Sequence, residues 1–165
     1  MTDNTSRFVL DYILGKSIDE NWKNWAYSNY ISGYDYESLM SLMVLDYPAN
    51  QFEAKDIVTN IFNDLNIDIA DIDFWICQYV NQVEKSIDYE STNEILKKLF
   101  PLYELYLQSD FKFMSIQEFY LLYNGISDLE DSGMQWYHKD LNEKNIEETV
   151  KFAFRKFHRE YCNLG

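Results

Sequence analysis

The sequence predicts an all-α protein, an irregular bundle of about seven to eight antiparallel helices in a single domain that spans residues 1–165. Three observations lead to this prediction. The chain contains only 5 Gly and 2 Pro in 165 residues, fewer turn residues than a β-sandwich or barrel of this length needs. It is 47% hydrophobic and 18% aromatic, which is enough to fill a core. Apolar residues recur at the 3.6-residue spacing of helices, and no convincing alternating strand pattern appears.

Three short helices are predicted before Pro48. Their boundaries are marked by familiar signals: a glycine after the helix end, a capping box, an aspartate N-cap and a helix-terminating proline. In chain order these are Gly15 after a helix that begins near Phe8, Ser17 with Glu20 before a second helix, Gly33 after it, Asp35 before a third, and Pro48 beyond Tyr47.

The two clearest helices are predicted at residues 54–65 and 72–87. In both, apolar residues follow the i, i+3, i+4, i+7 rule of an amphipathic helix packed on a core. The second stripe includes Trp75, Tyr79 and Ile87.

Three further helices are predicted in the C-terminal half. Ser91 and Glu94 have capping-box spacing, and Pro101 should kink or split the helix that they open near Lys97. A second pair with that spacing, Ser115 and Glu118, opens the next helix. Residues 127–142 are predicted to be an irregular connection that includes Gly133, and the last helix should run from about residue 145 to 161.

The charge is strongly negative and unevenly distributed. There are 14 Lys and Arg against 28 Asp and Glu, a formal net charge of −14 with a sequence pI near 4.4. Residues 1–90 carry 16 acidic and 5 basic side chains, and residues 91–165 carry 12 and 9. Such a surface repels phosphate backbones and anionic lipids, so we expect neither direct nucleic-acid binding nor membrane binding.

The two cysteines predict a reducing compartment. Cys77 and Cys162 lie far apart in the sequence and form no C-x-x-C motif. We therefore expect two separate, mostly buried thiols. No N-terminal signal pattern or long apolar run is present, so the predicted location is the cytoplasm.

No catalytic residue is predicted, and we expect the protein not to be an enzyme. The chain contains neither an H-E-x-x-H zinc helix nor a nucleophile elbow or phosphate-binding glycine motif. Its two histidines, His138 and His158, are expected to be surface or partly packed residues. No cofactor is expected.

One segment has part of the spacing of a calcium-binding loop. Asp64, Asn66 and Asp68 match the first, third and fifth positions of an EF-hand. The sixth position is Ile69 instead of Gly, and the twelfth is Trp75 instead of Glu. We therefore predict no metal site, and we expect Asp68, Asp71 and Asp73 to stabilise the N-terminus of the following helix.

The acidic half predicts a protein-binding surface. Between Asn24 and Glu84 there are ten carboxylates against the single Lys55, more than solubility requires. The run N-Y-I-S-G-Y-D-Y-E is also rich in Tyr, which often anchors interfaces. The hypothesis is an acidic, tyrosine-bearing face that docks onto a basic protein. Its predicted residues are Tyr34, Asp35, Tyr36, Glu37, Asp46, Glu53, Asp56, Asp64, Asp68, Asp71 and Asp73.

Three stretches resemble the small acidic helical immunity proteins of bacterial polymorphic-toxin and contact-dependent inhibition systems. They are I-D-E-N-W-K-N-W-A, S-G-Y-D-Y-E-S-L-M and A-K-D-I-V-T-N-I-F-N-D-L-N-I. The resemblance is diffuse and covers most of the chain. It implies a cognate toxin domain, often a basic nuclease, that is neutralised by tight one-to-one binding, and it implies no catalytic residues.

Three alternatives remain open at this point. A DNA-mimic or anti-defence inhibitor would carry its carboxylates in regular rows, whereas here they are scattered over predicted loops and caps. An enzyme with a cryptic site would be marked by a deep pocket that contains His138 or a pair of carboxylates. The sequence does not separate a structural or adaptor domain from an inhibitor, nor does it give the oligomeric state.

Overall fold

The computed structural model describes residues 1–2, 4–86 and 91–162, and all the regular elements in this part of the chain are helical. Eight α-helices are present there, so the predicted all-α class and helix number are confirmed. The chain divides into two compact units, Met1–Trp75 and Ile76–Gly165, and the division falls inside one helix. The prediction of a single domain over residues 1–165 stays a prediction.

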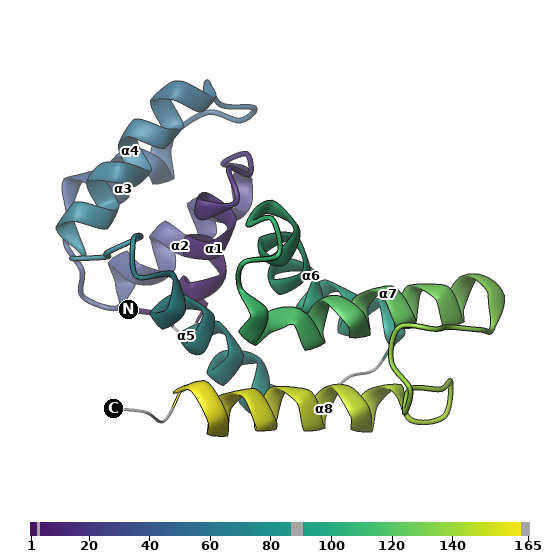
Figure 1. Ribbon diagram of the computed structural model, residues 1–165. Helices are drawn as coiled ribbons and strands as arrows, with labels where there is room; N and C mark the ends of the chain where they lie inside the picture. The colour runs from purple at the N-terminus through teal and green to yellow at the C-terminus, as the bar shows by residue number, and fades with distance from the viewer. Residues whose placement is uncertain (3, 87–90, 163–165) are drawn as a thin grey trace. The chain divides into compact units, whose positions relative to one another are not determined.

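The N-terminal unit consists of four helices and the first turn of a fifth (Figure 1). These are α1 (Thr5–Ile13), α2 (Glu20–Ile31), α3 (Glu37–Val44), α4 (Gln51–Asp64) and the start of α5 (Ile72–Lys85). Helix α3 packs against both α2 and α4.

Aromatic rings from α1, α2 and α4 form the core of the N-terminal unit. The ring of Trp22 lies 5.0 Å from that of Phe8 and 5.6 Å from that of Trp25, and Phe62 lies 6.4 Å from Trp25. Trp22, Trp25 and Phe62 are all buried. Burial of such large side chains is the main stabilising contribution to the unit.

Two buried polar groups fix the N-terminal segment to α2. Thr5 Oγ1 accepts a hydrogen bond from Trp25 Nε1 at 3.1 Å. Asn29 is fully buried; its side chain accepts from the Thr2 backbone N–H and donates to Thr2 Oγ1 and to the Trp25 carbonyl. Each buried polar atom of these side chains thus has a partner, as a stable core requires.

The C-terminal unit contains the rest of α5 and three further α-helices. Its other elements are α6 (Thr92–Gln108), a short 3-10 turn η1 (Met114–Ile116), α7 (Gln117–Ser132), α8 (Ile146–Phe157) and a π-helical turn η2 (His158–Cys162).

Stacked aromatic residues hold α6 and α7 together. Tyr103 on α6 lies between Tyr120 and Tyr123 on α7, at centroid distances of 5.6 and 4.1 Å. Phe100 contacts Tyr123, and Tyr106 contacts Tyr120. The pairing runs in opposite directions along the two helices, so α6 and α7 form an antiparallel hairpin.

Several predicted boundary signals are confirmed. Gly15 and Gly33 follow α1 and α2 with φ values of +69° and +99°, which favour glycine. Ser91 Oγ accepts from the backbone N–H of Glu94 at 3.3 Å and caps α6. Ile87, predicted at the end of the fifth helix, lies outside the described residues.

Other predicted caps are wrong. Asp19, not Ser17, caps α2, because its carboxylate accepts from the Asn21 backbone N–H at 3.0 Å. Asp35 does not cap α3, whose N-cap is Tyr36 without a side-chain hydrogen bond. Ser115 does not cap α7 either; it lies inside η1, which leads directly into that helix.

Two predictions about the C-terminal helices are corrected. Helix α6 runs through Pro101 as one helix, so of the predicted kink or split the split is wrong, and the kink stays a prediction. Helix α7 continues to Ser132, although residues 127–132 were predicted to be part of an irregular connection. Gly133, at φ +71°, ends it instead. Ile126 and Leu129 are buried, which explains why the helix continues into this acidic segment.

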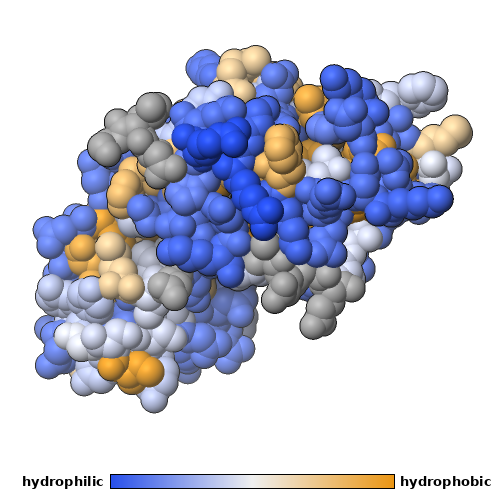
Figure 2. Space-filling view, turned by 90° about the horizontal axis from the view of Figure 1, so that it is seen from below, coloured by the Kyte–Doolittle hydropathy of each residue, from blue (hydrophilic) through white to orange (hydrophobic). Residues whose placement is uncertain are grey.

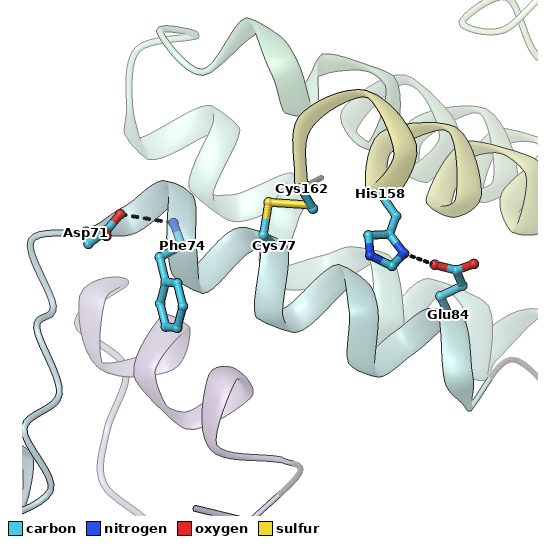
Figure 3. Close-up of a disulfide and its surroundings, with 6 residues drawn as sticks. All are labelled: Asp71, Phe74, Cys77, Glu84, His158 and Cys162. Atoms are coloured by element: carbon cyan, nitrogen blue, oxygen red, sulfur yellow. Dashed lines mark hydrogen bonds and ion pairs between the residues drawn. A yellow bond between two sulfur atoms is a disulfide. The ribbon is translucent and has the colours of Figure 1, made fainter. Parts of the chain in front are cut away.

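The expectation of two free thiols is wrong. Cys77 on α5 and Cys162 on η2 form a disulfide, with their Cα atoms 5.4 Å apart (Figure 3). Glu84 on α5 and His158 on η2 form an ion pair beside it. Residue numbers rise along one segment as they fall along the other, so α5 and η2 are antiparallel. This packing brings together two cysteines that are 85 residues apart.

Within the described residues, no helix has both the length and the apolar character that crossing a membrane would require.

Candidate partner-binding surface

Three of the predicted partner-binding residues line one concave surface of the N-terminal unit. Asp46 lies in the connection between α3 and α4, and Glu53 and Asp56 lie on α4. The hollow between them has a volume of about 820 Å³. We call it the acidic groove. Its other lining residues are Ser41, Val44, Leu45, Asn50, Ile57 and Asn60.

The helical period explains why these side chains face outward. Helix α4 buries Ala54, Val58 and Ile61 in the core. Glu53 and Asp56 therefore fall on the opposite, solvent-exposed side of the helix, three residues apart and on the same face.

The acidic groove carries uncompensated negative charge. Asp46, Glu53 and Asp56 are all exposed, and none of them forms an ion pair within the part of the chain that the structure describes. Among the described residues, no Lys, Arg or His lines the groove, and Lys55 on the same helix is not one of its lining residues. A concave surface of one charge sign raises the local concentration of an oppositely charged partner.

Exposed apolar residues accompany these carboxylates. Val44, which lines the groove, is 78% exposed, and Phe52, one turn before Asp56 on α4, is 85% exposed. On the face drawn in Figure 2, by comparison, hydrophilic residues predominate and hydrophobic residues form small, separate patches. Sequence reasoning missed both residues; for Phe52, the available signal was its position outside the apolar stripe of the helix.

Asp35, Tyr36 and Glu37 are exposed at the beginning of α3, as the hypothesis requires, but they do not line the acidic groove. They form a separate exposed acidic segment at the other end of that helix.

Tyr34 and Asp64 are half-buried and have partners inside the N-terminal unit. The Tyr34 hydroxyl accepts a hydrogen bond from the N-terminal ammonium group of Met1. Asp64 accepts a hydrogen bond from the Ser38 hydroxyl and so links α4 to α3. Both residues have a structural role, which makes them weaker candidates for partner binding.

The aspartates before α5 stabilise the local turn. The carboxylate of Asp68 accepts from the Ala70 backbone N–H at 2.9 Å, and that of Asp71 accepts from the Phe74 backbone N–H at 3.1 Å. Asp73 is exposed in the first turn of α5, where a negative charge is favourable. These contacts agree with the expectation that this loop supports the following helix.

Tyr47 contains a buried hydroxyl group that has no hydrogen-bond partner among the described residues. Burial raises the pKa of this hydroxyl above its ordinary value of 10.0, and the negative charges of Asp19 and Glu20 add to the increase. The Lys23 ammonium group lies 5.3 Å from the centre of the Tyr47 ring.

The two histidines lie in different environments within the C-terminal unit. His158 is half-buried and paired with Glu84. His138 lines a pocket of about 420 Å³ together with Glu118 and Glu160. This composition matches the sign that we expect of a cryptic site, but the pocket is open to solvent and not deep.

Comparisons of the chain with protein-family models, with curated proteins and with solved structures found no match.

Proposed function

We propose that the protein binds a basic protein partner through the acidic groove and acts as a non-catalytic inhibitor of that partner. The observation that supports this proposal best is the composition of the groove. Three exposed carboxylates line the groove together with the apolar side chains of Val44, Leu45 and Ile57, and among the described residues these carboxylates form no ion pair and no basic side chain lines the groove.

This composition favours a protein over a small cation as the ligand. Carboxylates steer a basic partner towards the groove and increase its association rate. Exposed apolar side chains such as Val44 and Phe52 then provide area that is buried in the complex. A partner segment with Lys or Arg beside apolar residues matches both features.

We further propose that the partner is a bacterial toxin domain and that the protein is its immunity protein. This part of the proposal depends on the resemblance of the three sequence stretches. The net charge of −14 fits a basic nuclease as the partner. A nuclease has a basic substrate path, which the acidic groove could cover.

The cytoplasmic location is also a proposal, and the disulfide weighs against it. The sequence-based expectation depended on two free thiols, whereas Cys77 and Cys162 are bonded. Disulfides persist mainly in oxidising compartments. Trapping thiols with an alkylating agent at the moment of cell lysis, followed by non-reducing electrophoresis, measures the oxidised fraction in the cell.

The partner is tested by affinity purification of the tagged protein from its own cells at low and moderate salt. A basic protein recovered in stoichiometric amount, and lost progressively as salt is raised, would support the proposal.

The groove is then tested with the triple variant Asp46→Asn, Glu53→Gln, Asp56→Asn. Its association rate at low salt should fall on the order of tenfold, because electrostatic steering is lost.

A matched control carries the same three changes on the C-terminal unit: Glu130→Gln, Asp131→Asn and Asp140→Asn. These carboxylates are also exposed, so the net charge changes equally. Both variants should keep the wild-type circular dichroism spectrum. Equal association rates of the two variants would show that only net charge matters and would contradict a role for the groove.

A further inference from the structure

The pocket that contains His138 is formed by three segments of the C-terminal unit that are distant in sequence. The segments are the first residues of η1 and α7, the connection before α8, and the end of α8 with η2. Its volume of about 420 Å³ lies in the range of small-molecule sites. This pocket is separate from the acidic groove and takes no part in the proposed function.

Aromatic side chains form the apolar part of a lining that is otherwise polar and charged. Phe119 and Phe157 are buried at its base, with their ring centroids 5.5 Å apart. Tyr161 packs on Phe157 at 4.8 Å and remains half exposed, as does Tyr137 on another segment. Planar apolar groups stack well on such surfaces.

Among the described residues, one cation of the pocket has no ion-pair partner. Lys156 Nζ and Glu118 Oε2 form an ion pair at 3.0 Å, which raises the pKa of Lys156. Glu160 pairs with Arg159 at 3.7 Å. Both carboxylates thus have a cationic partner. Lys139 forms no ion pair within the described residues.

The connection that carries Lys139 is held in a defined conformation. Gln135 Nε2 donates to the carbonyls of His138 and Leu141 at 2.6 and 2.8 Å. Gln135 Oε1 accepts from the His138 backbone N–H at 2.9 Å. One side chain thereby holds the backbone on both sides of Lys139 in place before any ligand arrives, which reduces the backbone part of the entropy cost of binding.

His138 forms part of the pocket wall. Its Nδ1 is shielded from solvent and has no hydrogen-bond partner among the described residues. Because this atom is not exposed to the pocket, a ligand there does not contact it.

We propose that this pocket binds a small organic anion with an aromatic or similarly flat apolar body. The anionic group pairs with Lys139, and the apolar body lies against Phe157 and Tyr161. A cationic ligand is disfavoured because Glu118 and Glu160 are already paired. A neutral ligand would leave the Lys139 ammonium group unused. The proposal is independent of partner binding at the acidic groove.

Three probes with the same ring and different charges test this inference: benzoate, benzamide and benzamidine. Each is titrated into ¹⁵N-labelled full-length protein, and amide chemical shifts are followed. Benzoate should shift the amides of Ser115, His138 and Lys139 and bind about tenfold more tightly than benzamide or benzamidine, as expected for a charge-assisted contact.

The variant Lys139→Gln should weaken benzoate binding about tenfold and leave benzamide binding unchanged. Lys144→Gln is the matched control, because Lys144 is an exposed lysine in the same connection and does not line the pocket. Both substitutions are at the surface, so both variants should fold. Benzamidine binding equal to benzoate binding, equal losses in the two variants, or no benzoate-induced shifts at the pocket would each overturn the inference.

Discussion

Thr5 accepts a hydrogen bond from the indole nitrogen of Trp25 at 3.1 Å in the buried core of the N-terminal unit. Thr5→Val keeps the shape of the side chain and removes the acceptor, which leaves the indole N–H buried without a partner. We expect a loss of about 1–3 kcal/mol in the free energy of unfolding. Urea unfolding followed by tryptophan fluorescence measures it. Thr59→Val, at an exposed position on α4, should change stability by less than half as much; equal losses would contradict the explanation.

Tyr47→Phe should leave stability at neutral pH unchanged or raise it by up to about 1 kcal/mol, because the substitution removes a buried hydroxyl without a partner. Burial raises the pKa of Tyr47 in the folded state. Below the unfolded pKa of about 10, Tyr47 is neutral in both states and causes no pH dependence of stability. As pH rises above that value, the unfolded state loses the proton before the folded state does, so the free energy of unfolding falls until the folded pKa is passed.

Urea midpoints at neutral and alkaline pH test this assignment. The wild type should lose more stability than Tyr47→Phe on going to alkaline pH. Tyr27→Phe changes an exposed tyrosine on α2 and should behave as the wild type. A wild-type loss that persists unchanged in Tyr47→Phe would show that another group is responsible.

Removing the disulfide should destabilise the C-terminal unit. The bond closes a loop of 85 residues, for which loop entropy predicts a contribution of about 4.5 kcal/mol. The double variant Cys77→Ser, Cys162→Ser should unfold at correspondingly lower urea concentration. Dithiothreitol should lower the stability of the wild type to nearly that of the variant, and it should have no effect on the variant itself. A wild type that is insensitive to reductant would contradict a stabilising role.

Gln135→Ala should disorder the connection before α8. The three hydrogen bonds between Gln135 and the backbone of His138 and Leu141 are lost, at a cost of about 1–3 kcal/mol. Amide hydrogen exchange of residues 135–141 should become faster. Met134→Ala, at an exposed neighbouring position, should leave the exchange rates unchanged. Similar rates in both variants would show that the connection is held by other contacts.

The helical fold could be predicted because its signals are local. Helix α4 has an uninterrupted apolar stripe, and the same period appears in α5. Gly15 and Gly33 mark real helix ends. The extension of α7 was missed because the acidic residues after Ile126 looked like a loop, whereas burial of Leu129 decides the helix. Such burial depends on tertiary packing, which a local pattern does not contain.

The site was predicted only in part. Sequence reasoning selected Asp46, Glu53 and Asp56, but it gave them no preference over the other eight candidate residues. They share a groove because the chain reverses direction between α3 and α4. Asp64 could not be set aside, because its hydrogen bond to Ser38 exists only in the folded chain. The pairing of Cys77 with Cys162 could not be predicted either, because only the folded chain brings the two cysteines together.

The disulfide also makes residues 77–162 a covalently closed ring. A single cut by a protease between these cysteines, for example in the connection before α8, opens the ring without releasing a fragment. The nicked protein would then migrate as one band until the sulfur–sulfur bond is reduced. Mechanical force applied between Met1 and Gly165 passes across the bond from Cys77 to Cys162. Helices α6, α7 and α8 would therefore carry no tension while the bond is intact.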